Sequence, residues 1–167
     1  QWRPPEEVVV KAADGVTDIH TLIYKPHDFD PELVYPVIEI IYAGSQMPVL
    51  PRTFVPSEYG HIAQALAQLN FVTVIVDGRG TPGRGKSFQD VVWRGIGRDE
   101  IPDHATALRQ LGATRPYMDL TRIGVHGKSW GGYFALRAML AAPESCATIS
   151  SIPVPTSGAS ACNKGTA

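Results

Sequence analysis

The sequence has few of the features that mark a disulfide-stabilised, membrane-spanning or nucleic-acid-binding protein. Its 167 residues include two cysteines, Cys146 and Cys162, which provide neither a disulfide framework nor a metal-binding spacing. Lys and Arg are scattered and the formal net charge is −1, so there is no electrostatic case for nucleic acid or an anionic membrane. No apolar run is long enough to span a bilayer. We therefore expect no nucleic acid, no membrane and no metal among its partners.

The N-terminal end lacks the marks of a start of translation or of secretion, and the C-terminal end lacks the varied composition of a folded segment. The first residues, QWRPPEEVVV, contain no initiator Met and no apolar core of a signal peptide, so we expect a chain cut from a longer protein. The last twelve, TSGASACNKGTA, are of low complexity and predict an unstructured end. We expect residues 1–150 to form a partial domain and residues 151–167 to form a disordered tail.

Short β-branched runs alternate with helical patterns along the rest of the chain. A hairpin is predicted over 6–26, because Asp14-Gly15 separates two strand patterns. Further strands are predicted over 37–44, 71–77, 122–127 and 146–152, and helices over 61–70, 98–112 and 129–142, with Gly112 just after the end of the second helix. This alternation predicts an α/β domain with a mostly parallel sheet and an N-terminal antiparallel hairpin.

A glycine-rich stretch after the strand at 71–77 matches two nucleotide-binding patterns. Residues 80–87, GTPGRGKS, fit the phosphate-loop pattern, and glycines 78, 80 and 83 fit G-x-G-x-x-G. Both patterns need a long helix directly afterwards, whose N-terminus binds phosphate. Gly95 and Gly97 interrupt any such helix after about two turns. We therefore interpret the stretch as a loop whose glycines adopt positive φ, and we expect no cofactor.

A second Gly-Lys-Ser lies in GKSWG, residues 127–131, which fits G-x-S-x-G. A buried strand pattern precedes it and a helix pattern follows it, which is the context of a nucleophile elbow. The sharp turn would hold Ser129 in a strained conformation with its hydroxyl exposed. Gly127 and Gly131 would avoid collisions around the turn. The backbone N–H of Trp130 would face an oxyanion.

This segment and three others resemble those of a known family. HGKSWGGYFALRAML resembles the nucleophile segment of the prolyl oligopeptidase family of serine peptidases, especially its dipeptidyl-peptidase-IV-like branch. Three other segments resemble that family in the same order: YPVIEIIYAG, FVTVIVDGRGTPGRGKSF and YMDLTRIGVHG. The resemblance covers roughly residues 15–143. It implies an α/β-hydrolase fold and a glycine-rich loop that is structural and binds no nucleotide.

The resemblance also implies roles for three residues. Ser129 would be the acylating nucleophile of a serine peptidase that acts on peptide substrates. The backbone N–H of Trp130 and the hydroxyl of Tyr42 would stabilise the oxyanion. Without the resemblance, Tyr42 would be interpreted as a tyrosine packed at a strand end with its hydroxyl in water. Asp77 and Arg79 are expected to fix the glycine-rich loop.

The sequence departs from the family after the nucleophile. The family order is serine, acid, histidine, but the residues after Ser129 contain no His and no Asp, and their one acid is Glu144. His126 is interpreted as a core histidine and His104 as part of a helix face. We therefore expect a domain that is incomplete at its C-terminus, lacking the family's β-propeller and the C-terminal part of the catalytic domain, and inactive alone.

Two alternatives remain open at the level of the sequence. One is a carboxylesterase or lipase on the same fold, although such enzymes usually carry an HGGG-like oxyanion loop where this chain has IIYAGS. The other is a non-catalytic fragment, favoured by the absence of a histidine after Ser129.

Overall fold

A mixed six-stranded sheet forms the centre of the domain. The computed structural model describes residues 3–52, 57–141 and 147–148. In this part of the chain the strand order is β1-β2-β4-β3-β5-β6. The bounds of the strands are β1 Glu6–Lys11, β2 Asp18–Tyr24, β3 Tyr35–Ile40, β4 Val72–Asp77, β5 Met118–His126 and β6 Ala147–Thr148. The β1–β2 and β2–β4 ladders are antiparallel, and the β4–β3, β3–β5 and β5–β6 ladders are parallel.

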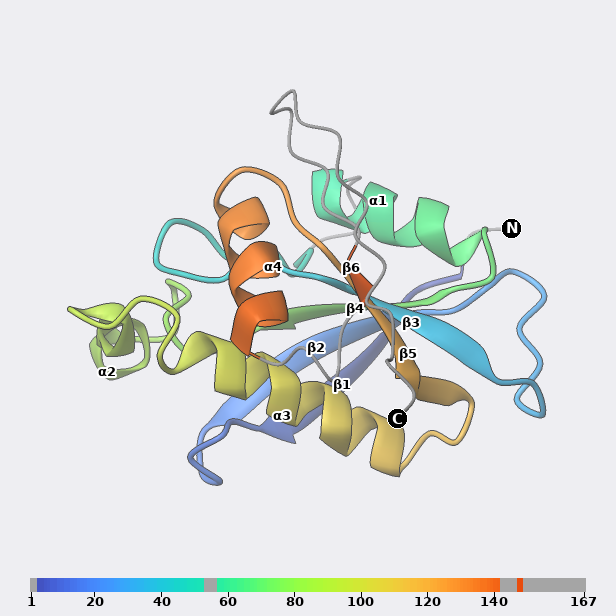
Figure 1. Cartoon of the computed structure of the whole chain (residues 1–167), viewed down its shortest axis with the longest axis horizontal. Coiled ribbons are helices and arrows are strands. Elements are labelled where there is room, and N and C mark those ends of the chain that lie inside the picture. The colour runs from blue at the N-terminus through green and yellow to red at the C-terminus, as the bar shows by residue number, and fades with distance from the viewer. Residues whose placement is uncertain (1–2, 53–56, 142–146, 149–167) are drawn as a thin grey trace, which may run out of the picture.

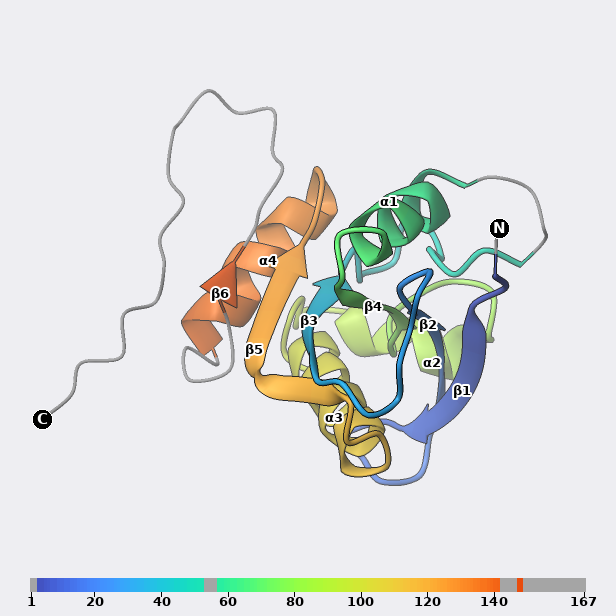
Figure 2. The same ribbon diagram turned by 90° about the vertical axis from the view of Figure 1, so that its right-hand side faces the viewer.

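Helices cover both faces of this sheet. Helix α1 (Glu58–Ala67) packs on one face, against β2, β3 and β4, while α3 (Glu100–Ala113) and α4 (Trp130–Ala141) lie on the other. Figure 1 shows α1 above the sheet and α3 below it, and Figure 2 shows α4 beside β5. Every residue of β4 is buried, as expected for a central strand that is covered on both faces. The domain therefore has three layers.

The predicted hairpin and its turn are confirmed. Strands β1 and β2 pair from Glu6 opposite Ile23 to Lys11 opposite Asp18. Gly15 in the turn has φ +75°, and Asp14 accepts hydrogen bonds from the backbone N–H groups of residues 16 and 17. Strand β2 also pairs antiparallel with β4, so the antiparallel part of the sheet extends one ladder beyond the hairpin.

The predicted end of α3 is wrong. The helix continues through Ala113, so Gly112 lies inside its last turn and not after it. A Cβ on Gly112 would lie 2.5 Å from Cδ1 of Leu120 in β5. The glycine therefore permits close packing between α3 and the sheet. The predicted strand at 146–152 is described only as β6, and the predicted tail at 151–167 lies outside the described residues.

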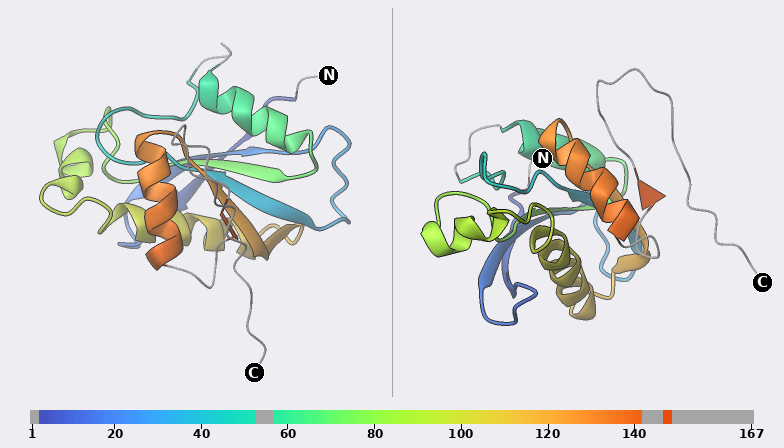
Figure 3. Two further views of the ribbon diagram at one scale, coloured as in Figure 1. Left: turned by 45° about the horizontal axis from the view of Figure 1, so that its top comes forward. Right: turned by 60° about the vertical axis from the view of Figure 1, so that its left-hand side comes forward.

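The segment between β4 and α3 projects from the side of the domain (Figure 3). It contains α2 (Lys86–Gln89) and a 3-10 turn (Asp90–Val92). Trp93 follows this turn and is 71% exposed. None of the helices in the described ranges has the length and hydrophobicity needed to cross a bilayer.

Candidate active site

Ser129 lies on the turn that joins β5 to α4. The strand ends at His126 and the helix begins at Trp130, so three residues make the whole connection. Ser129 has φ +56°, a left-handed conformation that costs a non-glycine residue about 1–2 kcal/mol. The side chain is exposed. A strained, exposed serine on the tight turn between a β-strand and a helix is the geometry of a nucleophile elbow.

Two glycines allow this turn to be so tight. A Cβ on Gly127 would lie 2.1 Å from the carbonyl oxygen of Gly131, and a Cβ on Gly131 would lie 2.2 Å from the carbonyl oxygen of Ile41. Real Cβ atoms do not approach other atoms so closely. Gly127 therefore lets the turn close on itself, and Gly131 lets the start of α4 rest against the backbone that follows β3.

Tyr42 lies at the same edge of the sheet as the elbow. Strands β3 and β5 are parallel neighbours, with Ile40 opposite His126. Tyr42 follows Ile40 by two residues, and its Cα would lie 3.1 Å from a Cβ on Gly131. The phenol ring is half-buried and contacts the ring of Tyr59 edge to face, with centroids 5.7 Å apart. The backbone of Tyr42 and the start of α4 thus lie together at the carboxyl ends of two adjacent strands.

Trp130 contributes a backbone and a side chain to this edge. Its backbone N–H belongs to the first turn of α4, where N–H groups have no intrahelical acceptor. Its indole stacks on Tyr133 with centroids 5.1 Å apart and contacts Phe134 edge to face at 5.8 Å. The indole Nε1 is buried and has no hydrogen-bond partner among the described residues. An unsatisfied donor of this kind costs about 1–3 kcal/mol.

A buried ion pair supports the sheet behind this edge. Glu39 of β3 and His104 of α3 are both buried, with Nδ1 of the imidazole 2.5 Å from Oε1 of the carboxylate. Burial alone would lower the pKa of His104. The charge and hydrogen bond of Glu39, aided by Asp103 and Asp77, outweigh burial and raise that pKa above its ordinary value. One sign of this pair is visible in the sequence, because Glu39 is an acid within the apolar run VIEIIYAG.

Arg79 fixes the glycine-rich loop, as predicted, whereas Asp77 holds the segment that follows β3 instead. Asp77 accepts hydrogen bonds from the backbone N–H groups of Val49 and Leu50, and burial raises its pKa. The guanidinium of Arg79 donates to both carboxylate oxygens of Asp103 at 2.8 Å. These contacts tie the loop after β4 to α3 and to the segment after β3.

The glycine-rich loop does not have the geometry of a phosphate loop. Strand β4 leads into it, but the helix that follows, α2, has only four residues. Gly80, Gly83 and Gly85 have φ values of +99°, +92° and +98°, which confirms the predicted positive φ in the loop. A Cβ on Gly80 would lie 2.5 Å from Val92. Over the residues whose placement is described, no cluster of three or more His, Cys, Asp or Glu side chains is arranged to hold a metal ion.

The histidines are spread over the domain. His104 is engaged with Glu39, His20 contacts Glu7 and His27 contacts Asp28. His61 is on the exposed side of α1. His126 is half-buried at the end of β5, where burial lowers its pKa and so favours the neutral imidazole. The predicted helical position of His104 is confirmed, but its side chain faces the sheet and is buried. Glu144 lies outside the described residues.

Comparisons with known proteins agree with this architecture. Over 139 residues the chain is 34% identical to human dipeptidyl peptidase 8, a match that covers 83% of this chain and 15% of that protein. It is 32% identical over 111 residues to venom dipeptidyl peptidase 4 of Vespula vulgaris, covering 66% of this chain and 14% of that protein. The crystal structure of Porphyromonas gingivalis dipeptidyl peptidase 4 matches with a TM-score of 0.79 and 29% identity, over 90% of this chain and 21% of that one.

The layered sheet and the serine on its strand-to-helix turn define an α/β-hydrolase domain. A model of the prolyl oligopeptidase family matches residues 57–153, and the chain belongs to that family. It spans about 15% of the length of the curated relatives described above.

Proposed function

We propose that this chain is the nucleophile-bearing part of a serine peptidase that cleaves short peptides. The main support for this proposal is Ser129, which is held at φ +56° between β5 and α4 in a chain that belongs to a peptidase family. Matched relatives named dipeptidyl peptidases support a substrate cleaved near its N-terminus.

The proposed chemistry is acyl transfer. Ser129 Oγ attacks the carbonyl carbon of the scissile peptide bond while a base accepts the hydroxyl proton. The carbonyl oxygen becomes an oxyanion, which accepts hydrogen bonds from the Trp130 backbone N–H and the Tyr42 hydroxyl. The C–N bond then breaks, the leaving amine takes the proton, and water hydrolyses the ester to regenerate Ser129.

The sequence has no histidine after Ser129, where the family has its catalytic base. No His or Asp follows Ser129, and the buried ion pair with Glu39 makes His104 unsuitable as a base. A serine peptidase without its histidine loses several orders of magnitude in rate. We therefore propose that the 167-residue chain is inactive alone and that the complete site needs an acid and a histidine from elsewhere.

A chimera tests the nucleophile directly. Residues 6–141 replace the corresponding segment of Porphyromonas gingivalis dipeptidyl peptidase 4, whose structure they match. We expect hydrolysis of a dipeptidyl p-nitroanilide that Ser129→Ala abolishes. Ser87→Ala is the matched control, because Ser87 is also an exposed serine after Gly-Lys and lies in α2. Equal loss in both variants, or full activity in Ser129→Ala, would contradict the assignment.

Two further measurements separate the alternatives. A p-nitrophenyl ester cleaved far faster than the dipeptidyl amide by the chimera would favour a carboxylesterase. Fluorophosphonate reacts appreciably only with an activated serine, and we expect no labelling of the 167-residue chain by itself. Labelling that disappears in Ser129→Ala would show that a histidine within this sequence, or from a second copy, activates the serine.

A further inference from the structure

Two short segments at the edge of the site each contain a non-glycine residue in the left-handed conformation. Ala43 has φ +52° and Gly44 has φ +74°, directly after Tyr42. Ser129, across from them, has φ +56°. Only four non-glycine residues in the described part of the chain have positive φ, and two of them flank this junction. Strained conformations persist where the surrounding contacts enforce them, and they gather at functional sites.

Each of these two segments contacts the other through a glycine. From one side, Gly131 in α4 rests against the Ile41 carbonyl, and its missing Cβ would lie 3.1 Å from the Cα of Tyr42. From the other side, Gly44 rests against the indole of Trp130, where a Cβ would lie 2.3 Å from Nε1 and 3.2 Å from Cδ1. The two segments can pack this closely only because neither Gly131 nor Gly44 has a side chain at the point of contact.

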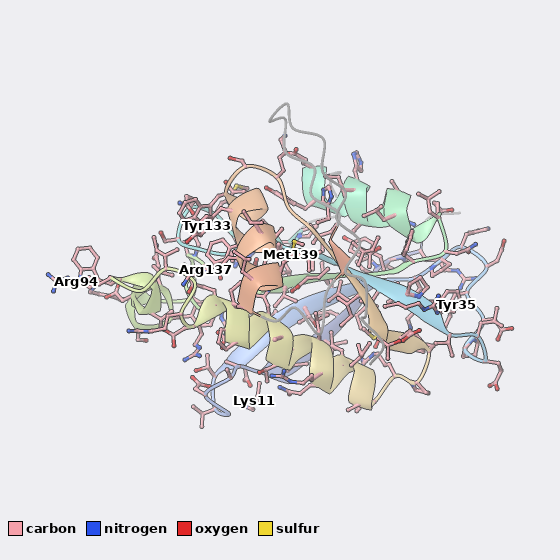
Figure 4. The ribbon with its side chains drawn as sticks, in the orientation of Figure 1. Lys11, Tyr35, Arg94, Tyr133, Arg137 and Met139 are labelled. Carbon is pink, nitrogen blue, oxygen red and sulfur yellow. The ribbon has the colours of Figure 1, made fainter. Side chains whose placement is uncertain are left out.

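The indole cannot easily retreat from this contact. Tyr133 stacks on it and Phe134 packs against it edge to face. Tyr133 is itself held by Arg137, whose Nη1 donates to the phenol oxygen at 2.8 Å, and both side chains lie on the same side of α4 (Figure 4). A new atom at Gly44 would therefore displace the 42–44 turn and not only the indole.

We propose that Gly44 is a positioning residue for the active site. Because it has no side chain, the indole edge of Trp130 sits directly on the Ala43–Gly44 turn, and this contact fixes Tyr42 relative to Ser129. Trp130 Nε1 points to the site that a Gly44 side chain would occupy, and it is buried there without a hydrogen-bond partner among the described residues. The inference rests on the proposed function only for the roles of Tyr42 and Ser129 in catalysis.

The test is carried out first on the 167-residue chain by NMR. The Trp130 indole N–H resonance is assigned by its disappearance in Trp130→Leu, and the Tyr42 ring resonances by Tyr42→Phe. We expect Gly44→Ala to shift both sets of resonances. Gly15→Ala is the matched control, because Gly15 has φ +75° and nothing lies within 4 Å of its Cβ position. The control carries the same backbone strain without the collision, and we expect it to shift neither.

A rescue variant keeps the test decisive if Gly44→Ala does not fold. Trp130→Leu removes the Nε1 atom that the new Cβ would meet, so Gly44→Ala combined with Trp130→Leu should fold. If this double variant stays unfolded, or if Gly44→Ala leaves the Tyr42 resonances unchanged, Gly44 does not position the site.

Activity is measured separately in the chimera. A displacement of about 1 Å at a reacting group can lower the rate roughly 10²-fold, so we expect Gly44→Ala to lower kcat by about that factor with little change in KM. Gly15→Ala should leave both constants close to those of the parent. An unchanged kcat in an active chimera would overturn the positioning role. A chimera that is inactive before any substitution contradicts the proposed function instead, and the NMR result then decides the role of Gly44.

Discussion

Replacing Glu39 by Gln should destabilise the domain and change how its stability depends on pH. The carboxylate is buried beside His104 in the central strand β3. Removing one member of a buried ion pair costs about 3–5 kcal/mol. Because glutamine keeps the volume and can still accept a hydrogen bond from Nδ1, about 1 kcal/mol should be recovered. We therefore expect a loss of about 2–4 kcal/mol from a total stability of about 5–15 kcal/mol.

The sign of the pH dependence follows from the raised pKa of His104. The stabilisation from the charged imidazole is complete below the unfolded pKa of about 6.5 and is lost as the pH rises through the higher folded pKa. In Glu39→Gln the main cause of that raised pKa is removed, and burial should lower the pKa instead. The difference in stability between parent and variant should therefore be largest below about pH 6 and should narrow as the pH rises.

Urea unfolding between pH 5.5 and 9 measures both effects. With a slope of about 2 kcal/mol per molar urea, the midpoint should fall by about 1–2 M at the acidic end. Glu7→Gln is the matched control, because Glu7 contacts His20 through the same chemistry at the surface. An exposed pair contributes less than about 1 kcal/mol, so its midpoint should move by less than about 0.5 M. Equal shifts in both variants, or a difference that does not change with pH, would refute the reasoning.

Three further substitutions test other parts of the structure. Gly131→Ala places a Cβ 2.2 Å from the Ile41 carbonyl oxygen, so urea unfolding should show a loss of about 1–3 kcal/mol; an unchanged midpoint would mean that α4 does not rest there. Arg79→Lys loses the two-point contact with Asp103, so thermal unfolding should show a free energy of unfolding lower by about 1–2 kcal/mol. A variant as stable as the parent would show that this contact does not stabilise the domain. Hydrogen bonds from the Thr17 hydroxyl and from the backbone N–H groups of Thr17 and Val16 lower the pKa of Asp14 to about 2. The stabilisation from its carboxylate is therefore complete above about pH 4 and is lost as the pH falls towards 2. Asp14→Asn should remove that part of the acid dependence in urea titrations, and identical acid profiles would contradict this.

Local sequence patterns predicted the elements well because each pattern reflects nearby residues. The Asp14-Gly15 turn and the apolar run of β4 carry their own conformational preference and burial, and both are confirmed. The start of α1 was predicted too late. The helix begins at Glu58, where Ser57 accepts a hydrogen bond from the backbone N–H of Gly60. Gly112 was misplaced because its lack of a side chain serves packing against Leu120, and this is a tertiary requirement.

The candidate site was predictable only in part. The context of Ser129 between a strand and a helix is visible in the sequence, and the family resemblance pointed to Tyr42. The pairing of Glu39 with His104 joins residues 65 positions apart, and no local pattern connects them. The contact between Gly44 and Trp130 is likewise set by the adjacency of β3 and β5, which becomes known only when the strand order is known.

The buried Glu39 also has a consequence for the order in which this domain forms during synthesis. Strand β3 leaves the ribosome before α3, so Glu39 exists for a time without its partner His104. A lone carboxylate cannot enter an apolar layer without a large desolvation penalty. The middle of the sheet should therefore stay open to water until residues up to about 113 have been made and α3 can dock. Because of Glu39, the strands made first should become fully buried only after α3 has been made. This delay discourages premature collapse of an incomplete chain.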